Sequence, residues 1–434
     1  MGMRFYQSLI GNALAEAWES DVALHAQRVR LAALIRHAVE NVPFYREHFR
    51  RAGIRTEHIR TPRDLLRIPV ISKIDVIRAG DSFLDRHAPR GNLAHGSSSG
   101  SSGLRLPFHA RWEELSALGG ILWSALLASG VRPVDRIVSV SSRHFQWAPP
   151  PYYITPLRSE ARIDEWVQSL RRIEPTVIIG PTEAIAGLSF ELQRERGPRL
   201  GRIRGIYTYG WTLTEEIREI IRDALHCDPI DLYASTETIW CGAQCGAREG
   251  FHIPYHRLIV QVAHPTAINQ EAVEGQVGEL VITDLTRRTM PFIRYRTGDA
   301  AAVVHERCAC GRGGPQIRNL LGRIMDVLVS TEGRPVRPGA FGLVKMHRLG
   351  YLADYQLIQE SRNQVRFMWV RGTQWSPSAM DEILNGIRSA LGPVDIVQEP
   401  VEEIRFEGEG KRRRIRRAFE ISNEEILRLR SPGS

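Results

Sequence analysis

The sequence has no long apolar run and few cysteines, and both absences exclude classes of protein. No segment of its 434 residues approaches the length of a membrane-spanning helix, which needs roughly 18 consecutive apolar residues. The first twenty positions also lack the basic and then apolar order of a signal peptide. The cysteines are odd in number and clustered, unlike a secreted disulfide framework: Cys227, Cys241, Cys245, Cys308 and Cys310. We therefore expect a soluble, cytoplasmic protein whose cysteines bind a metal or pack in a core.

Acidic residues are outnumbered by basic ones, which favours an anionic ligand. The 58 Lys and Arg against 49 Asp and Glu give a formal net charge of +9. The arginines are spread along the chain, although "KRRRIRR" at 411–417 is a local cluster. A dedicated nucleic-acid stripe is therefore not indicated, and we expect neither a nucleic-acid nor a membrane partner. A basic, zinc-containing nucleic-acid-binding protein stays open as the alternative of another class.

The order of apolar patterns predicts an α/β protein. An amphipathic helix with Val29, Leu31, Leu34, Ile35 and Val39 on its buried face is expected before Pro43. Between residues 111 and 240, short apolar runs alternate with helical patterns, as in a mostly parallel sheet: runs at 135–142, 175–181 and 202–210, helices at 162–173, 182–197 and 214–226. After residue 249 the sequence is rich in strand-like runs, at 257–264, 275–285 and 290–306, which predict hairpins or a barrel-like sheet. The last hundred residues read as a β-β-α-β unit, the size of a small domain.

A serine-glycine stretch at 97–103, "SSSGSSG", is the one segment of low complexity. Composition alone leaves two interpretations open, a short linker or a loop whose backbone N–H groups and hydroxyls hold phosphate. The stretch fits neither G-x-x-x-x-G-K-[ST] nor the dinucleotide G-x-G-x-x-G.

Four later motifs favour the phosphate loop. They are "DLYASTET" at 231–238, "PFIRYRTGDAA" at 291–301, "LLGRIMD" at 320–326 and "EGEGKRRRI" at 407–415. Together and in this order they resemble the adenylate-forming superfamily of acyl-CoA synthetases, adenylation domains and luciferases. Within it, "FIRYRTGD" and the segments at 38–54 and 61–76 are similar to the phenylacetate-coenzyme A ligase and CapK-like branch.

This resemblance implies an α/β fold of two domains. A large N-terminal adenylation domain over 1–322, with parallel sheets and a barrel-like subdomain, would bind ATP and the acyl substrate. A small, mobile α+β lid domain would follow over 323–434. The sequence leaves the oligomeric state open, including a homodimer.

The resemblance also implies roles for particular residues. The phosphate loop would comprise Ser98, Ser99, Gly100, Ser101, Ser102 and Gly103. Tyr233 would stack on adenine in a loop continued by Ala234 and Ser235, Thr236 would bind the α-phosphate, and Glu237 would coordinate Mg²⁺. Asp299 would accept the ribose hydroxyls, Arg323 would lie near ribose and phosphate, and Lys411 would be the C-terminal lysine that stabilises charge during adenylation.

The sequence departs from the family pattern at several positions. Trp211 stands where a glutamate is common, Ala234 where a glycine is usual, and Met325 at a hinge position that is commonly Asp or Lys. These three leave adenylation in place and put thioester formation in question. Leu104 and Arg105 stand where a lysine is usual, so the charge of the phosphate loop is shifted to Arg105, or adenylation is weaker than in the relatives.

Cys245, His252, Cys308 and Cys310 are predicted to bind a structural zinc, because thiolates and imidazole suit a closed tetrahedral Zn²⁺ site. Some phenylacetate-ligase-like proteins carry a structural zinc here. The alternative is a set of buried free thiols.

The predicted activity is ATP-dependent conversion of a carboxylic acid to an acyl-adenylate, followed by transfer to coenzyme A. An aromatic acid is favoured, because Phe145, Trp147, Tyr152 and Tyr153 supply aromatic lining, although they can equally be ordinary packing. The alternative within the family is transfer to a carrier-protein thiol or to an amine in a biosynthetic pathway.

Overall fold

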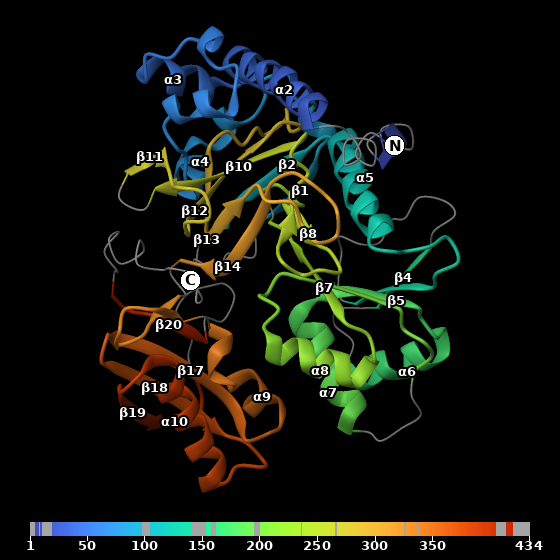
Figure 1. Cartoon of the computed structure of the whole chain (residues 1–434), viewed down its shortest axis with the longest axis vertical. Coiled ribbons are helices and arrows are strands. Elements are labelled where there is room, and N and C mark those ends of the chain that lie inside the picture. The colour runs from blue at the N-terminus through green and yellow to red at the C-terminus, as the bar shows by residue number, and fades with distance from the viewer. Residues whose placement is uncertain are drawn as a thin grey trace. The chain divides into compact units, whose positions relative to one another are not determined.

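The chain forms two compact units, and each brings together segments that are distant in the sequence. One contains residues 1–130 and 232–320, and the other contains 131–231 and 321–434. The computed structural model describes residues 5–7, 9–10, 20–97, 105–140, 153–157, 162–194, 200–235, 237–264, 267–324, 327–336, 338–404 and 414–419. Figure 1 gives the element labels used below. None of the helices in these ranges is both long and apolar enough to cross a lipid bilayer.

The first unit begins with helices that cover part of its core. Helix α2 (Ser20–Asn41) packs against α3 (Pro43–Arg51), and α4 (Lys73–Ala79) and α5 (Trp112–Ala128) follow (Figure 1). Pro43 stands in the first turn of α3, where its missing N–H costs no hydrogen bond. Four short 3-10 helices connect these elements, at Thr56–His58, Pro62–Arg67, Gly80–Phe83 and Arg90–Asn92.

The buried face of α2 differs from the sequence prediction at one position. Leu31, Leu34 and Ile35 are fully buried, whereas Val29 is 56% exposed. Val29 and Leu31 are two positions apart, which is roughly 200° around a helix, so Val29 faces away from the core. The buried stripe continues through Ala38 and Val42 instead.

The strands of the first unit follow one another in one sheet in the order β11-β10-β12-β13-β14-β9-β8. Antiparallel pairing joins β10 to β11 and β12, β12 to β13, and β9 to β8 and β14. The strands are β8 (Gly242–Gln244), β9 (Phe251–His252), β10 (Leu258–His264), β11 (Ala267–Glu271), β12 (Gly278–Asp284), β13 (Tyr295–Val304) and β14 (Gln316–Arg323), the last of which continues into the second unit. This confirms the hairpin pattern predicted after residue 249.

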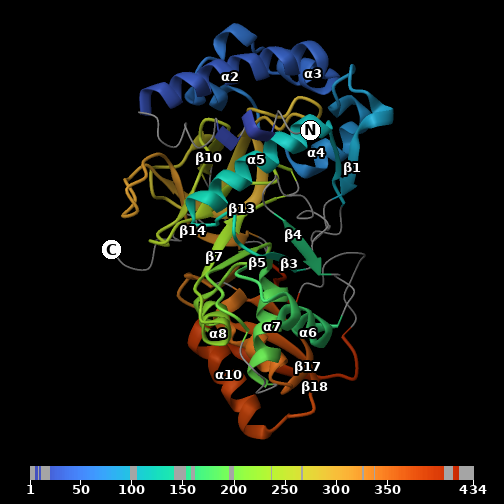
Figure 2. The same cartoon turned by 90° about the vertical axis from the view of Figure 1, so that its right-hand side faces the viewer.

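Parallel strands and three helices form the predicted βαβ region of the second unit. Strand β3 (Ile137–Val140) pairs in parallel with β4 (Ile154–Leu157) and β5 (Val177–Pro181), and β5 pairs with β6 (Gly205–Tyr209). Helix α7 (Thr182–Arg194) packs against both α6 (Ile163–Ile173) and α8 (Glu215–Leu225) (Figure 2). Strand β7 (Pro229–Tyr233) follows α8 and crosses the division between the units.

The C-terminal part of the second unit has its own sheet and hydrophobic core. Its sheet has the order β19-β18-β17-β20, and helix α10 (Pro377–Leu391) contributes to the core. The strands are β17 (Leu352–Ser361), β18 (Gln364–Arg371), β19 (Asp395–Pro400) and β20 (Ile415–Arg417), and β15 (Leu328–Val329), β16 (Pro335–Val336), a 3-10 turn (Pro338–Phe341) and α9 (Leu343–Arg348) precede them. The predicted β-β-α-β order is therefore present. The boundary between residues 322 and 323 stays a prediction.

Candidate active site

Tyr233 and Asp299 meet in the core of the first unit, although 66 positions separate them in the sequence. Tyr233 is the last residue of β7, and Asp299 lies on β13. The Tyr233 hydroxyl donates a hydrogen bond of 2.7 Å to Asp299 Oδ2. Burial, together with the neighbouring carboxylate, raises the pKa of Tyr233 well above its ordinary value. Tyr233 therefore stays protonated and holds one oxygen of Asp299 in a fixed direction.

Glu237 lies in the loop that follows β7 and is held by a tyrosine from β13. Its carboxylate Oε1 accepts a hydrogen bond of 2.8 Å from the Tyr295 hydroxyl, and both side chains are buried. Within the loop, the Thr238 amide donates to Ser235 Oγ, and the Cys241 amide donates to the Tyr233 carbonyl. These bonds turn the chain back on itself directly beside the Tyr233–Asp299 pair.

The same loop contains a strained residue. Ile239 has φ +65°, a left-handed conformation that is costly for a β-branched side chain and persists only where the surroundings enforce it. Arg257 supplies part of that enforcement, because its guanidinium donates to the carbonyls of Thr238 and Trp240. Arg257 is fully buried and also pairs with fully buried Asp284 at 2.6 Å.

The predicted phosphate loop is framed by a small hairpin in the first unit. Strands β1 (Ala94–Ser97) and β2 (Pro107–Ala110) pair in antiparallel fashion, with Ser97 opposite Pro107. The loop residues themselves lie outside the described residues: Ser98, Ser99, Gly100, Ser101, Ser102 and Gly103. The pairing brings Ser97 and Pro107, on either side of the loop, into one small sheet. The phosphate-binding role of the loop stays a prediction.

Other predicted residues are distributed as follows. Thr236 and Lys411 lie outside the described residues, as do Leu104 and Met325. Arg323 is exposed at the end of β14 and belongs to the second unit. Of the aromatic residues expected to line an acyl pocket, only Tyr153 is described, and it is 79% exposed.

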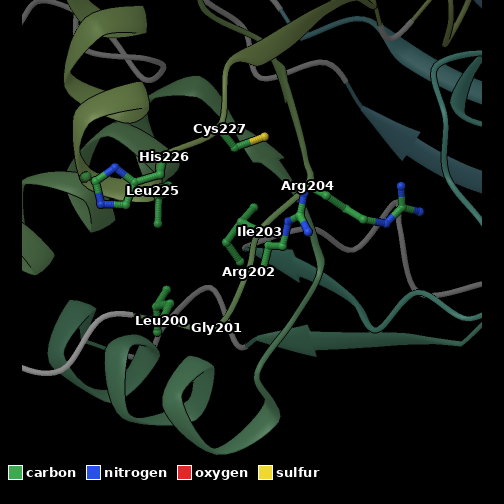
Figure 3. A pocket seen from close by; sticks show the side chains of 9 residues that line it. Leu200, Gly201, Arg202, Ile203, Arg204, Leu225, His226 and Cys227 are labelled. Carbon is green, nitrogen blue, oxygen red and sulfur yellow. The ribbon is translucent and has the colours of Figure 1, made fainter.

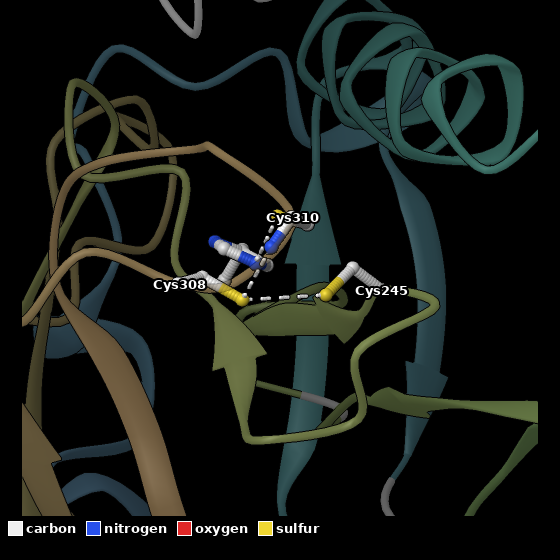
Figure 4. Close-up of side chains that lie close together, drawn as sticks. Cys245, Cys308 and Cys310 are labelled. Atoms are coloured by element: carbon white, nitrogen blue, oxygen red, sulfur yellow. Dashed lines mark hydrogen bonds between the residues drawn. The ribbon is translucent and has the colours of Figure 1, made fainter.

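The four predicted zinc ligands converge in the first unit, and Figure 4 shows three of them, Cys245, Cys308 and Cys310. Cys245 follows β8, His252 ends β9, and Cys308 and Cys310 lie in the turn before β14. The Sγ atoms of Cys245 and Cys308 are 3.6 Å apart, and Cys310 Sγ is 3.4 Å from His252 Nε2. All four donor atoms lie within 4.8 Å of one another. Cys241 lies apart from them and is fully buried, as expected of a core residue.

The surroundings of this cluster shift the pKa values of its residues in different directions. Burial lowers the pKa of His252 to about 4, so its ring is neutral and has a lone pair to donate. Burial raises the pKa of Cys308 to about 12. Burial also acts to raise the pKa of Cys310, but hydrogen bonds from Arg312 bring it down to about 7. Three sulfurs and one imidazole nitrogen at these separations match the donor set of a tetrahedral zinc site.

A cavity of about 520 Å³ lies in the second unit (Figure 3). Its lining includes Arg202 and Arg204 before β6, and His226 and Cys227 before β7. These residues stand at the amino ends of their strands, whereas ligands of parallel α/β sheets bind at the carboxyl ends. The cavity is therefore not part of the site formed by Tyr233, Glu237 and Asp299.

Sequence reasoning missed Tyr295, Arg257 and Arg287 as parts of the site. Arg287 is fully buried, and its Nη1 donates to the carbonyl of Glu237 at 2.8 Å. Tyr295 lies inside the quoted motif "FIRYRTGD", and its place four residues before Asp299 was a usable signal. The two arginines gave no such signal, because an isolated arginine ordinarily indicates an exposed position.

Comparison with known proteins agrees with the motifs. No family model matches the chain. The phenylacetate-coenzyme A ligase of Thermus thermophilus is 29% identical over 349 residues, which cover 76% of this chain and 77% of the relative. The ligase of the same name from Escherichia coli K12 is 26% identical over 325 residues (71% and 72%), and Protein CapK of Staphylococcus aureus is 21% identical over 333 residues (70% and 69%).

Solved structures agree on the fold. A 2-hydroxyisobutyryl-CoA ligase, solved in the postadenylation state with an acyl-AMP, matches with a TM-score of 0.73 at 18% identity, covering 93% of this chain and 90% of that one. The anthranilate CoA ligase AuaEII matches with a TM-score of 0.52 at 14% identity, covering 74% and 65%. The chain therefore has the fold of the adenylate-forming superfamily, and its sequence resembles the phenylacetate-coenzyme A ligase and CapK branch of that superfamily.

Proposed function

We propose that this protein is an AMP-forming acid-thiol ligase. A carboxylate oxygen attacks the α-phosphorus of ATP, the bond to pyrophosphate breaks, and an acyl-adenylate forms. The thiol of coenzyme A then attacks the acyl carbon and releases AMP. Because the reacting groups need mainly positioning and charge screening, the protein's task is to hold them.

The observation that carries this proposal is the pair of buried contacts at the carboxyl end of β7. Tyr233 holds Asp299, and Tyr295 holds Glu237, so two carboxylates are fixed beside one loop. The Asp299 carboxylate has two acceptor oxygens, as a group that accepts ribose hydroxyls needs. Adenine would stack on Tyr233, and Thr236, Arg323 and Lys411 keep the roles that the family resemblance implies.

We propose Mg²⁺ and Zn²⁺ as the metals. The Glu237 carboxylate is an oxygen donor of the kind that Mg²⁺ prefers, together with phosphate oxygens of the nucleotide. The magnesium ion would neutralise charge on the phosphates. Zinc held by Cys245, His252, Cys308 and Cys310 would be structural, because these ligands tie the segments after β8 and before β14 to β9.

Within this proposal, the acid is aromatic or similarly compact, and coenzyme A is the acceptor. Phenylacetate is the acid in the names of the Thermus thermophilus and Escherichia coli relatives, and anthranilate is the acid of one structural neighbour. The competing acceptors are a carrier-protein thiol and an amine. If AMP is released without coenzyme A but only when a carrier protein or an amine is present, that acceptor would be favoured. A homodimer is proposed as the assembly state, and light scattering tests it.

Pyrophosphate release with a panel of aryl, fatty and amino acids tests the function. We expect release with an aromatic acid, and its loss in Glu237→Gln. Glu47→Gln is the matched control, because Glu47 is a surface partner of Arg50 and Arg51 on α3, outside the site. Equal rates in the two variants would contradict the role of Glu237. No release with any acid would count against the function itself.

A further inference from the structure

Strand β13 carries a bulge, and this bulge contains Asp299. Three residues of β13, at 297–299, stand opposite the single residue Leu280 of β12, and regular pairs flank them on both sides: Glu279 with Ala300 and Val281 with Arg296. A bulge bends its strand and changes the direction of the side chains in it, and bulges are common beside active sites. The shape of this bulge therefore determines where the Asp299 carboxylate points.

Hydrogen bonds within the bulge account for part of its shape. The Thr297 hydroxyl donates to the Leu280 carbonyl at 3.0 Å and accepts from the Asp299 amide at 3.0 Å. Gly298 has φ +76°, a left-handed conformation that glycine adopts without strain. The amide of Gly298 donates to a side chain outside the bulge, that of Glu279 on β12.

Glu279 uses one carboxylate to bind the bulge and the residue before it. Oε1 accepts from the Gly298 amide at 3.1 Å, and Oε2 accepts from Arg296 Nε at 2.9 Å and from Arg296 Nη2 at 2.6 Å. Glu279 is buried, and the guanidinium of Arg296 offsets the charge that it carries there. Hydrogen bonds to an ionised carboxylate are stronger than those between neutral groups. Glu279 therefore fixes the middle of the bulge relative to the residue at which the bulge begins.

We propose that Glu279 is a positioning residue for Asp299, and through Asp299 for the ribose of ATP. It holds the bulge in the shape in which Asp299 Oδ2 accepts from the Tyr233 hydroxyl at 2.7 Å. This inference rests on the proposed function, in which Asp299 accepts the ribose hydroxyls. It concerns the ribose rather than the metal ion, because the bulge contains Asp299, whereas Glu237 lies in the loop after β7.

The test compares ATP with 2′-deoxyATP and 3′-deoxyATP, each of which lacks one ribose hydroxyl. Binding is measured by calorimetry with MgCl₂ and without an acid. In the wild-type protein we expect at least one analogue to bind about tenfold more weakly than ATP, because it loses a hydrogen bond to a carboxylate.

Glu279→Gln should remove this preference for ATP. A glutamine amide offers one acceptor oxygen in place of two, so it cannot satisfy Gly298 and Arg296 as the carboxylate does. We expect ATP to bind about tenfold more weakly and the analogue to change by less than about twofold, because the analogue does not make the hydrogen bond that the variant weakens. A purely structural role would weaken ATP and the analogue alike, and that result would overturn the inference.

Asp135→Asn is the matched control. Asp135 is a buried carboxylate that also accepts from one arginine side chain and one backbone amide, those of Arg204 at 2.7 Å and Arg132 at 2.6 Å. It belongs to the second unit, whereas Asp299 belongs to the first. The control variant is expected to lower the melting temperature and to leave the ratio of ATP affinity to analogue affinity unchanged. The same fall of this ratio in both variants would overturn the inference.

A second variant keeps the test decisive if Glu279→Gln does not fold. Gly298→Ala keeps Glu279 and adds a side chain where φ is +76°, so the bulge must change its shape and the affinity ratio should fall in the same way. Asp299→Asn is the reference, because it removes one of the two acceptor oxygens directly. If the ratio falls in Asp299→Asn and stays unchanged in folded Glu279→Gln and Gly298→Ala, this inference alone is overturned. If the wild-type protein does not bind ATP, the proposed function is overturned and this inference with it.

Discussion

Removing the Tyr295 hydroxyl, which donates a hydrogen bond to Glu237, tests whether Glu237 binds magnesium. Tyr295→Phe removes the hydroxyl that donates to Glu237 Oε1 at 2.8 Å and leaves a ring of the same shape. Because the acceptor is a buried carboxylate, the lost bond corresponds to about 1.5–3 kcal/mol. If that energy is used to hold Glu237 toward the metal, the apparent magnesium affinity should fall about 10- to 100-fold.

The assay is initial-rate pyrophosphate release over a titration of MgCl₂, with ATP and the acid fixed. We expect the half-activating magnesium concentration to rise and the KM for the acid to stay the same. Tyr45→Phe is the control, because Tyr45 is also fully buried and its hydroxyl donates to the carbonyl of Pro291 at 2.9 Å. An unchanged magnesium requirement in Tyr295→Phe, or the same rise in Tyr45→Phe, would refute the reasoning.

Three further predictions concern the ribose contact, the zinc cluster and pH. Asp299→Asn should raise the KM for ATP at least tenfold with the acid KM unchanged, because an amide offers one acceptor oxygen in place of two; equal KM values for ATP would contradict it. Purified protein should contain about one zinc per chain by mass spectrometry. The Cys308→Ser variant should lose most of this zinc and have a lower melting temperature. A protein without zinc whose thiols are freely titratable would contradict the site. Burial, with Arg30 and Arg257, lowers the pKa of His256 to about 3 from 6.5. As the pH falls below 6.5, the unfolded chain therefore binds a proton at this residue and the folded chain does not. The free energy of unfolding should drop by about 2 kcal/mol between pH 7 and pH 5, and by less in His256→Gln.

The fold was largely readable because its elements carry regular apolar patterns. The runs at 177–181 and 205–209 are rich in apolar and β-branched residues, and the one helix between them, α7, follows a helical apolar pattern, so a parallel arrangement was predicted. The exposed position of Val29 shows the limit of this reading, since hydrophobicity alone does not say which side of α2 meets the core. The division into two units draws on contacts between distant segments, which a local pattern does not contain.

The residues of the candidate site that belong to a known motif could be predicted from the sequence. Their buried hydrogen-bond partners could not. Asp299 and Glu237 were identified from motifs, and the structure adds the tyrosine hydroxyl that holds each of them. Arg287 was not foreseen, because a buried guanidinium depends on carbonyls that tertiary folding brings to it. The spacing of the cysteines and the histidine predicted the zinc cluster. Short paired strands bring these residues together, because the ligands lie at or next to the ends of those strands.

Formation of an acyl-adenylate tests the central claim most directly. Purified protein is incubated with MgATP and an aromatic acid in the absence of coenzyme A, and the acid-soluble products are separated by mass. The account predicts acyl-AMP and an equal amount of pyrophosphate, with neither product in Glu237→Gln. A folded protein that binds ATP but forms no acyl-AMP with any acid of the panel would contradict it.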